Sequence, residues 1–575
     1  MPMYIDEIPN RKSPPTVLLR KSHRNGEKID KHTIANLSDL PPKVIDLLRL
    51  ALKNVELVPK EGSFAVERST PTGHVQAVLG VARKLGLDAL LSSRRCPERD
   101  LVLAMVVQRL LTPCSKLAMA RLWDTTTLAR DLEIGEADEN GLYAALDWLA
   151  KRQKRIEQKL AARHLAEGAH VLYDVSSSTY YGHSCPLAAR GRDRDHRGEL
   201  CIVYGLMTDM QGRPVSVQVY PGNTGDPATL PDQVGKLRDQ YGLERVVLVG
   251  DRGMLTQARI DALRRFPNLG WLSALRSKAI QGLVGQGALQ MSLFDEQNLA
   301  EIASEDLPGE RLVVCYNPLL AEDRRRTRTE LLEATEEDLK RIEAQVARRT
   351  KKPMGADEIG LRVGKVINRY KVGKHFKLDI QDNHFSFARD EEGIAREEAL
   401  DGIYVIRTSE QSEDLSAPDA VRAYKSLAQV EQAFRCLKGL DIRIRPVHHR
   451  TPERVRAHIL VCMLAYYVEW HMRQALAPVL FQDEELDCDR WTRDPVAKAQ
   501  PSQSAVEKKQ EQGTPEGWPV HSFATLLETL ATRTRNTCRV GEGKDAVRFD
   551  TYTEPSPFQE HVFELLGVKP GTCTQ

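Results

Sequence analysis

With 575 residues the chain is longer than one hydrophobic core supports, so we expect several domains. Its 82 basic residues are nearly matched by 80 acidic ones, which gives a formal net charge of +2. This balance excludes binding of nucleic acid through an overall positive charge, so any such surface has to be local.

The cysteines and the apolar segments indicate the cellular compartment. None of the ten cysteines stands in a CxxC pair, and His448-His449 has no cysteine at zinc-finger spacing, so we expect reduced cysteines that serve packing. The most apolar segment, residues 459–468, is too short to span a bilayer, and neither a signal peptide nor a lipidation motif is recognisable. We expect a cytoplasmic protein without a membrane anchor.

The first two regions of the chain differ in their patterns. Residues 1–70 contain two strand-like runs around Asn25-Gly26, a dipeptide typical of tight hairpins, and predict a small β module. Residues 71–165 carry the apolar periodicity of helices. Basic residues are interleaved in this helical region, at Arg83, Lys84, Arg94, Arg95 and Arg121. They form either a charged solvent face or a surface that binds DNA ends.

Residues 166–276 alternate strand and helix patterns and predict an α/β domain. Two of its strands are joined by a turn at residues 209–212 and should form a hairpin. Residues 246–250 are apolar on both faces, so this strand should lie centrally and parallel to a neighbour. The first strand, residues 170–178, is interrupted by Asp174, whose charge needs water, a metal ion or a basic partner.

The second half of the chain divides into three further regions. Residues 277–410 predict a β-rich insertion with a long charged helix, whose arginine runs either follow a DNA backbone or lie on a solvated helix. Residues 411–480 return to the α/β domain and contain two helices. Residues 481–575 predict a linker up to about residue 518 and a C-terminal helical tail that ends with an amphipathic helix at residues 521–532.

Residues 421–438 predict a single helix with two distinct faces. One face is an apolar stripe that should pack against the domain, formed by Leu427, Val430, Phe434 and Leu437. The other face gathers four polar side chains within about 60°, namely Tyr424, Glu431, Arg435 and Lys438. This helix therefore presents an acid, two bases and a phenol to a site.

Three acids are candidates for the site. Asp174 lies in the first strand, Asp251 directly follows an apolar strand, and Glu431 lies on the polar face of the helix. In open α/β sheets such sites form beyond the carboxyl ends of the strands. Clustered carboxylates repel one another unless a cation joins them, and their hard oxygen atoms select Mg²⁺ or Mn²⁺. Two such ions would favour phosphoryl transfer on DNA or RNA.

The order of strand with Asp174, strand with Asp251, insertion and helix with Glu431 resembles bacterial insertion-sequence transposases of the DDE type. One group of these enzymes carries the signature Tyr-x2-Arg-x3-Glu-x6-Lys, and Tyr424, Glu431 and Lys438 stand at its spacings. Leu427 replaces the signature arginine, and Arg435 is a candidate substitute for its phosphate contact. The resemblance covers residues 170–475 and implies a ribonuclease H-like mixed sheet flanked by helices, interrupted by the β-rich insertion.

The resemblance also implies an activity. The enzyme would cut the ends of a mobile element by metal-dependent hydrolysis and join the resulting 3′-OH to target DNA. Asp174, Asp251 and Glu431 would hold two Mg²⁺ ions, which Mn²⁺ can replace, and Tyr424, Arg435 and Lys438 would contact DNA. The partners implied are the terminal inverted repeats, the target DNA and a second copy of the chain in a synaptic complex, at the bacterial nucleoid.

Two other functions remain open. The chain could be a transposase-derived DNA-binding protein without catalysis, or a carbohydrate-active enzyme that uses paired carboxylates and needs no metal. Asp209 and Asp226 suit a hairpin turn and a helix start, so we do not place them in the site. We assign no function to four histidines, His183, His196, His448 and His449.

Overall fold

A computed structural model describes residues 3–571 except 11–13, 26–27, 54–63, 136, 192–197, 287–288, 290–293, 295–297, 350, 487–492, 498 and 541–545. The chain divides into two compact units. The first comprises Met1–Thr70, Thr534–Thr553 and Thr572–Gln575, and the second comprises Pro71–Arg533 and Glu554–Gly571. No helix among the described residues is long and apolar enough to cross a membrane.

The first unit contains two small sheets. The antiparallel order β1-β2-β3 joins β1 (Met3–Ile8), β2 (Thr16–Asn25) and β3 (Lys28–Asn36), and α1 (Pro42–Leu52) packs on it through Ile45. The second sheet has the order β17-β16-β4, with β4 (Ala65–Pro71), β16 (Thr534–Val540) and β17 (Val547–Tyr552). The predicted hairpin of the first strands is confirmed, although Gly26 of its turn lies outside the described residues.

The second unit begins with the helical region that the sequence predicts. Its helices are α2 (Gly73–Lys84), α3 (Leu87–Leu91), α4 (Pro97–Leu111), α5 (Lys116–Arg121), η1 (Trp123–Thr125), α6 (Leu128–Asp131), α7 (Glu139–Ala150) and α8 (Gln153–His164). Helix α4 is buried along almost its whole length, because α2, α7 and α17 (Pro452–Ala475) pack around it. An apolar helix of this kind is stabilised by burial on every side.

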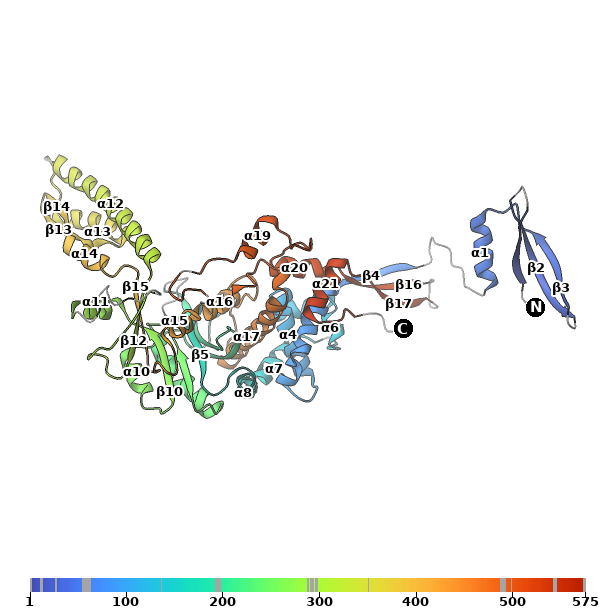
Figure 1. The fold of residues 1–575 in the computed structure, drawn as a ribbon, viewed down its shortest axis with the longest axis horizontal. Coiled ribbons are helices and arrows are strands. Elements are labelled where there is room, and N and C mark those ends of the chain that lie inside the picture. The colour runs from blue at the N-terminus through green and yellow to red at the C-terminus, as the bar shows by residue number, and fades with distance from the viewer. Residues whose placement is uncertain are drawn as a thin grey trace. The chain divides into compact units, whose positions relative to one another are not determined.

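A mixed sheet of nine described strands forms the centre of the second unit (Figure 1). Its strands are β5 (Ala169–Thr179), β6 (Ala189–Arg190), β7 (Leu200–Thr208), β8 (Pro214–Pro221), β9 (Val246–Val249), β10 (Leu269–Ala274), β11 (Leu299–Ile302), β12 (Arg311–Tyr316) and β15 (Ile403–Thr408). Strands β8, β7 and β5 are antiparallel neighbours, and β5, β9 and β10 are parallel. The predicted hairpin and the central parallel strand are both confirmed, and the α/β fold is consistent with the ribonuclease H-like class.

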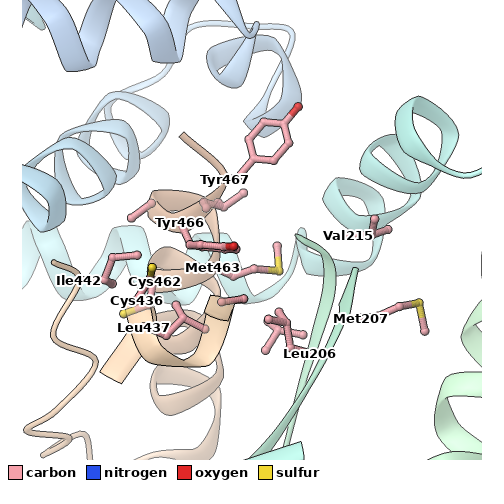
Figure 2. Packing of buried hydrophobic residues seen from close by; sticks show 14 of the residues in the cluster. Leu206, Met207, Val215, Cys436, Leu437, Ile442, Cys462, Met463, Tyr466 and Tyr467 are labelled. Carbon is pink, nitrogen blue, oxygen red and sulfur yellow. The ribbon is translucent and has the colours of Figure 1, made fainter. Parts of the chain in front are cut away.

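Helices cover this sheet. Helix α16 (Leu427–Lys438) packs on β5 and β7, and α17 packs on β8. Figure 2 shows Leu437 of α16 and Met463 of α17 gathered with Leu206 of β7 in the core. The remaining short elements of this part are η2 (Asp226–Thr229), α9 (Leu230–Gly235), η3 (Lys236–Gln240), α10 (Gln257–Leu263) and α15 (Ala417–Lys425).

The prediction of one helix over residues 421–438 is wrong. The segment forms two helices, α15 and α16, which are separated at Ser426. The hydroxyl of Ser426 donates a hydrogen bond to the carbonyl oxygen of Arg422 at 2.9 Å. A serine that bonds back to the preceding turn competes with the helical hydrogen bonds and bends a helix. Tyr424 therefore does not share a helix with Glu431.

The segment predicted as a β-rich insertion contributes to two cores. Strands β11, β12 and β15 extend the central sheet, and α11 (Ser277–Gly285) packs beside them. The elements between β12 and β15 surround a separate core that includes Leu339, Ile359 and Phe385. These elements are α12 (Pro318–Arg348), α13 (Ala356–Tyr370), η5 (Gly373–His375), β13 (Phe376–Gln381), β14 (His384–Arg389) and α14 (Glu391–Glu398).

The C-terminal region is more structured than the sequence predicts. Helix α19 (Gln503–Glu511) lies in the segment predicted as a linker, and η6 (Ala477–Val479) precedes it. The predicted amphipathic helix corresponds to α20 (Phe523–Ala531), which packs on α2, but α21 (Pro557–Leu566) follows it and is capped by Ser556 and Gln559. The eight described cysteines are free thiols, as expected, while Cys488 and Cys573 lie outside the described residues.

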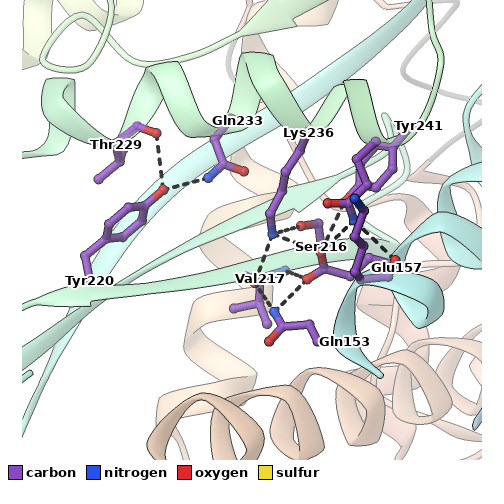
Figure 3. Close-up of polar contacts among 11 residues, drawn as sticks. Gln153, Glu157, Ser216, Val217, Tyr220, Thr229, Gln233, Lys236 and Tyr241 are labelled. Atoms are coloured by element: carbon purple, nitrogen blue, oxygen red, sulfur yellow. Dashed lines mark hydrogen bonds and ion pairs between the residues drawn. The ribbon is translucent and has the colours of Figure 1, made fainter. Parts of the chain in front are cut away.

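A buried carboxylate ties α8 to the sheet (Figure 3). Glu157 is 1% exposed, and its Oε1 accepts hydrogen bonds from Gln153 Nε2 at 2.9 Å and from the Val217 backbone N–H at 3.1 Å. Its Oε2 accepts from Lys236 Nζ at 2.9 Å and from the Tyr241 hydroxyl at 3.3 Å. Gln240 Nε2 also donates to Oε2 at 3.5 Å, so each oxygen atom has at least two donors and this acid is a satisfied structural group.

Replacing Glu157 should destabilise the second unit. Glu157→Ala removes one member of a buried ion pair and leaves Lys236 uncompensated, so we expect a loss of about 3–5 kcal/mol in the free energy of unfolding, measured as a lower urea midpoint. The surface variant Glu330→Ala serves as the control and should keep the midpoint. A midpoint for Glu157→Ala equal to that of the control would contradict a structural role for this carboxylate.

Candidate functional site

The parallel pairing of β5 with β9 brings two of the candidate acids to the same level of the sheet. The pairing ends at Leu172 and Val249; Asp174 stands two residues further along β5, and Asp251 stands two residues after Val249, in the turn that follows β9. Adjacent strands lie roughly 4.8 Å apart, so the pairing brings both residues to the same end of the β5–β9 ladder. Strand β9 ends at Val249, and Asp174 is a partly exposed position between buried neighbours on β5.

Asp251 occupies a tight turn after β9. Its Oδ1 accepts hydrogen bonds from the backbone N–H groups of Gly253 at 3.0 Å and Met254 at 2.7 Å. These bonds fix the carboxylate at the carboxyl end of the strand, which is where ligands bind in open α/β sheets. The other acid has a local bond as well, because Asp174 Oδ1 accepts from the Val175 N–H at 2.8 Å.

Glu431 reaches the sheet through α16. This helix packs on β5, and Phe434, one turn after Glu431, meets the ring of Tyr204 edge-on at 5.8 Å. Tyr204 pairs with Ser176 of β5, so α16 crosses the strand close to Asp174. The Glu431 side chain is 61% exposed and lies 3.5 Å from Arg435 Nη2. Such a surface ion pair is worth about 0–1 kcal/mol, so little holds the carboxylate in that position.

Tyr424 lies within electrostatic reach of two of the acids. It is partly buried on α15, and burial raises the pKa of its phenol. The negative charges of Asp251 and Glu431 raise this pKa further, and Arg252 lowers it. A phenol that senses both carboxylates is close to each, so Tyr424 links the turn after β9 to α16 although the helix is interrupted between them.

The two predicted basic contacts lie on the same helix as Glu431. Arg435 is exposed one turn further on, and Lys438 is the last residue of α16. Leu427, at the position of the signature arginine, begins this helix. The bases therefore lie in series along the exposed side of α16, where a DNA strand could approach them.

The three candidate acids do not form the tightest cluster of potential metal ligands. Among the described residues, the group whose ligand atoms all lie within 4.8 Å of one another is Cys436, Asp441 and Glu469, and the candidate acids are farther apart. Arg473 already neutralises that group, because its Nε lies 2.6 Å from Glu469 and its Nη2 lies 3.0 Å from Asp441. Burial raises the pKa of Glu469 to about 7. The group is an ion-pair network that joins α17 to the end of α16.

Asp209 was predicted to serve the hairpin turn, and its contacts confirm this. Its Oδ1 accepts from the backbone N–H groups of Gln211 at 3.0 Å and Arg213 at 2.9 Å, and its Oδ2 accepts from Arg213 Nε at 2.6 Å. Asp226 begins η2, as expected of a helix-start residue. Of the four histidines without an assigned function, His183 and His448 are exposed, His449 is partly buried, and His196 lies outside the described residues.

Most basic residues singled out in the helical region have structural partners. Arg83 donates to the carbonyl oxygen of Asp131 at 3.0 Å, and Lys84 donates to that of Leu566 at 2.9 Å. Arg95 pairs with Asp100 at 2.7 Å. Sequence reasoning instead missed Arg109 and Lys116, which are buried beside a cavity. The available signal was a charge, Arg109, inside the apolar run of residues 101–111.

The mixed sheet, Asp174 within β5, Asp251 in the turn after the neighbouring strand β9, and helix α16 packed on β5 are the features of an α/β protein consistent with the ribonuclease H-like class. The family model described as "Transposase DDE domain" matches residues 170–468, more than half of the chain, and the chain therefore belongs to this family. No curated protein sequence matches the chain. Membership supports a transposase function in general, with DNA as the substrate and a divalent metal as the usual cofactor of the family.

Cross-linking would test the register on which this site depends. In the double variant Asp174→Cys/Asp251→Cys, a short dithiol cross-linker should join the two positions, because they neighbour each other across the sheet. Proteolysis and mass spectrometry would identify the joined peptides. The matched control Ser177→Cys/Asp251→Cys places the first thiol on the opposite face of β5, three residues further on, and should give little product. Equal yields from the two pairs would contradict the register.

Proposed function

We propose that the protein cuts the ends of a mobile DNA element by metal-dependent hydrolysis and joins the resulting 3′-OH to target DNA. The observation that carries this proposal is the parallel pairing of β5 and β9, which supports a site formed by Asp174 and Asp251 at one end of the two strands, beside the helix that carries Glu431. Family membership supports transposase chemistry in general. The site supplies carboxylates of the kind that such chemistry requires.

Asp174, Asp251 and Glu431 would hold the metal ions in this proposal. Their donor atoms are all carboxylate oxygens, which suit Mg²⁺ and also Mn²⁺. Asp174 lies on β5 and Asp251 follows the adjacent strand β9, while the exposed side chain of Glu431 would turn toward them from α16. Two bound ions would activate the attacking water or hydroxyl and stabilise the charge on the leaving oxygen.

The chain's own residues would position the DNA. Arg435 and Lys438 lie along the exposed side of α16 and would bind phosphates on either side of the scissile bond. The Tyr424 hydroxyl stays protonated at neutral pH, because burial raises its pKa, and it would donate a hydrogen bond to a phosphate oxygen beside the acids. Arg435 would replace the phosphate contact that Leu427 cannot make.

The proposal includes the partners expected of this reaction. Two element ends have to be brought together, so we propose a homodimer that holds the terminal inverted repeats in a synaptic complex and acts at the bacterial nucleoid. We assign residues 71–165 to end binding, residues 166–276 and 411–480 to the catalytic domain, residues 277–410 to its insertion, and residues 1–70 and 481–575 to flanking modules. Inverted repeats beside the reading frame would identify the DNA substrate.

Two alternatives predict different assays. A transposase-derived DNA-binding protein would bind element ends without cutting them, whereas the presence of all three acids favours catalysis. A carbohydrate-active enzyme would work in EDTA, because acid/base catalysis by paired carboxylates needs no metal. The proposed reaction should stop in EDTA and resume when Mg²⁺ or Mn²⁺ is restored.

Neutralising the acids should abolish cutting and leave DNA binding intact. For Asp174→Asn, Asp251→Asn and Glu431→Gln we expect the rate of strand cleavage on element-end DNA to fall at least about a thousandfold, because metal stabilisation is worth several kcal/mol. Gel-shift assays on the same DNA should show affinity within a few fold of the wild type.

The matched control is Asp261→Asn, which removes an exposed acid of α10 in the same domain and should cut at the wild-type rate. Normal Mg²⁺-dependent cleavage by any one of the three acid variants would remove that residue from the site. Loss of cleavage in the control as well would show that a general change of charge, and not the proposed site, is being measured.

A further inference from the structure

A strongly cationic cavity lies away from the candidate acids. Its volume is about 540 Å³, and it is lined by α4, α5, α7, the start of α17 and the loop between α16 and α17. The lining includes three histidines and no acidic residue. It also includes six basic residues, namely Arg109, Lys116, Arg443, Arg445, Arg450 and Arg454.

Two of these cations are buried without a counter-charge. Arg109 is 7% exposed and Lys116 is 5% exposed. Across the described chain, no carboxylate lies within ion-pair distance of either side chain, and the Lys116 ammonium group has no hydrogen-bond partner there. Arg109 donates one bond, to the carbonyl oxygen of Arg443 at 3.3 Å. Burial, with the nearby Arg109 charge, lowers the pKa of Lys116 to about 7.

Neighbouring groups hold the walls of the cavity in place. Arg454 makes a two-pronged pair with Asp147 at 2.8 and 2.9 Å and lies over the ring of Tyr143. His458 Nε2 lies 3.0 Å from the carbonyl oxygen of Ile444. Since these contacts are internal to the protein, the cavity is already formed before any ligand arrives. Unpaired buried cations are unfavourable, and an anion in this cavity would compensate them.

The cavity is also connected to the strand that carries Asp174. Tyr180, just beyond β5, donates from its hydroxyl to the carbonyl oxygen of His449 at 3.0 Å, and the Tyr181 N–H donates to that of Val447 at 2.9 Å. Asp174 precedes Tyr180 by six residues, or roughly 20 Å at about 3.3 Å per residue. The cavity therefore lies beside the chain that leaves the far end of the strand carrying Asp174.

We propose that this cavity binds phosphate groups of a DNA strand away from the scissile bond, with Arg109 and Lys116 as its innermost anion ligands. The exposed Arg443 and Arg450 would guide the backbone inward. The ring of Tyr143, which meets His449 edge-on at 6.0 Å, offers an aromatic surface for the sugar or base of the same nucleotide. This inference rests on the proposed function for its choice of DNA as the source of the phosphate.

The test compares Lys116→Met with wild type in EDTA, so that no cutting occurs. Methionine fills a similar volume without a charge, and the full-length variant should melt at a higher temperature because a buried unpaired cation is gone. Its affinity for a single-stranded oligonucleotide should fall, and the slope of log K against log salt should become shallower by about 0.7 for one lost phosphate contact. The control Lys154→Met, an exposed lysine outside the cavity, should keep the wild-type melting temperature and slope within error.

The outcomes separate this inference from the proposed function. An unchanged salt slope in Lys116→Met, with Mg²⁺-dependent cleavage intact in wild type, overturns the cavity proposal alone. A shallower slope without any cleavage by wild type overturns the proposed function alone. A third outcome concerns inorganic phosphate at constant ionic strength. If phosphate raises the melting temperature of wild type but not of Lys116→Met, and the slope of log K against log salt for the oligonucleotide is the same in both proteins, the cavity binds a free anion. That result overturns the assignment to DNA.

Discussion

The parallel register of β5 and β9 is the constraint on which the candidate site depends. Asp174 lies in β5 and Asp251 stands two residues after the end of β9, so the backbone hydrogen bonds between the two strands bring both acids to the same end of the pair. A shift of one residue would turn one of the two side chains to the opposite face of the sheet. The apolar residues of β9 are buried on both faces of the sheet. A shift would pack each of them against different side chains, which disfavours it.

Helix α16 is positioned at both ends by interactions that do not involve the candidate acids. At its start, the hydrogen bond from the Ser426 hydroxyl to the Arg422 carbonyl oxygen separates α16 from α15. Helix α16 can therefore cross β5 in a direction different from that of α15. At its end, Arg473 of α17 joins Asp441 and Glu469 and holds the loop that follows α16. Glu431 lies between these two fixed points with an exposed side chain, so its backbone is constrained while its carboxylate can rotate.

The fold contrasts two ways of burying a charge. Both carboxylate oxygens of Glu157 accept hydrogen bonds, and these bonds join α8 to β8 and to the region of η3. A buried carboxylate whose oxygens are satisfied in this way is typical of a structural group. Lys116 is almost as deeply buried, but among the described residues it has Arg109 and no acid beside it. A buried cation of this kind lowers the stability of the fold. Proteins retain such destabilising groups mainly at sites that bind a ligand or catalyse a reaction.

Much of the architecture follows from local patterns that the sequence displays. The hairpin of β7 and β8 and the central strand β9 were predictable because apolar alternation and turn residues are short-range signals. The break at Ser426 was not, since a serine inside good helical periodicity bends the chain only when its hydroxyl bonds backward. The β-rich character of residues 277–410 was predictable, but the place of β11, β12 and β15 in the central sheet depends on long-range pairing. The cationic cavity was also out of reach, because Arg109 and Lys116 meet the loop after α16 only in the folded chain.

The central claim is that Asp174, Asp251 and Glu431 bind a divalent ion together. The most direct measurement replaces that ion with Fe²⁺ and uses ascorbate and hydrogen peroxide to generate hydroxyl radicals, which cut the polypeptide next to the bound metal. We expect cuts beside all three acids that excess Mg²⁺ suppresses and that Asp251→Asn removes. Cuts suppressed by Mg²⁺ that fall instead beside Cys436, Asp441 and Glu469 would contradict the account.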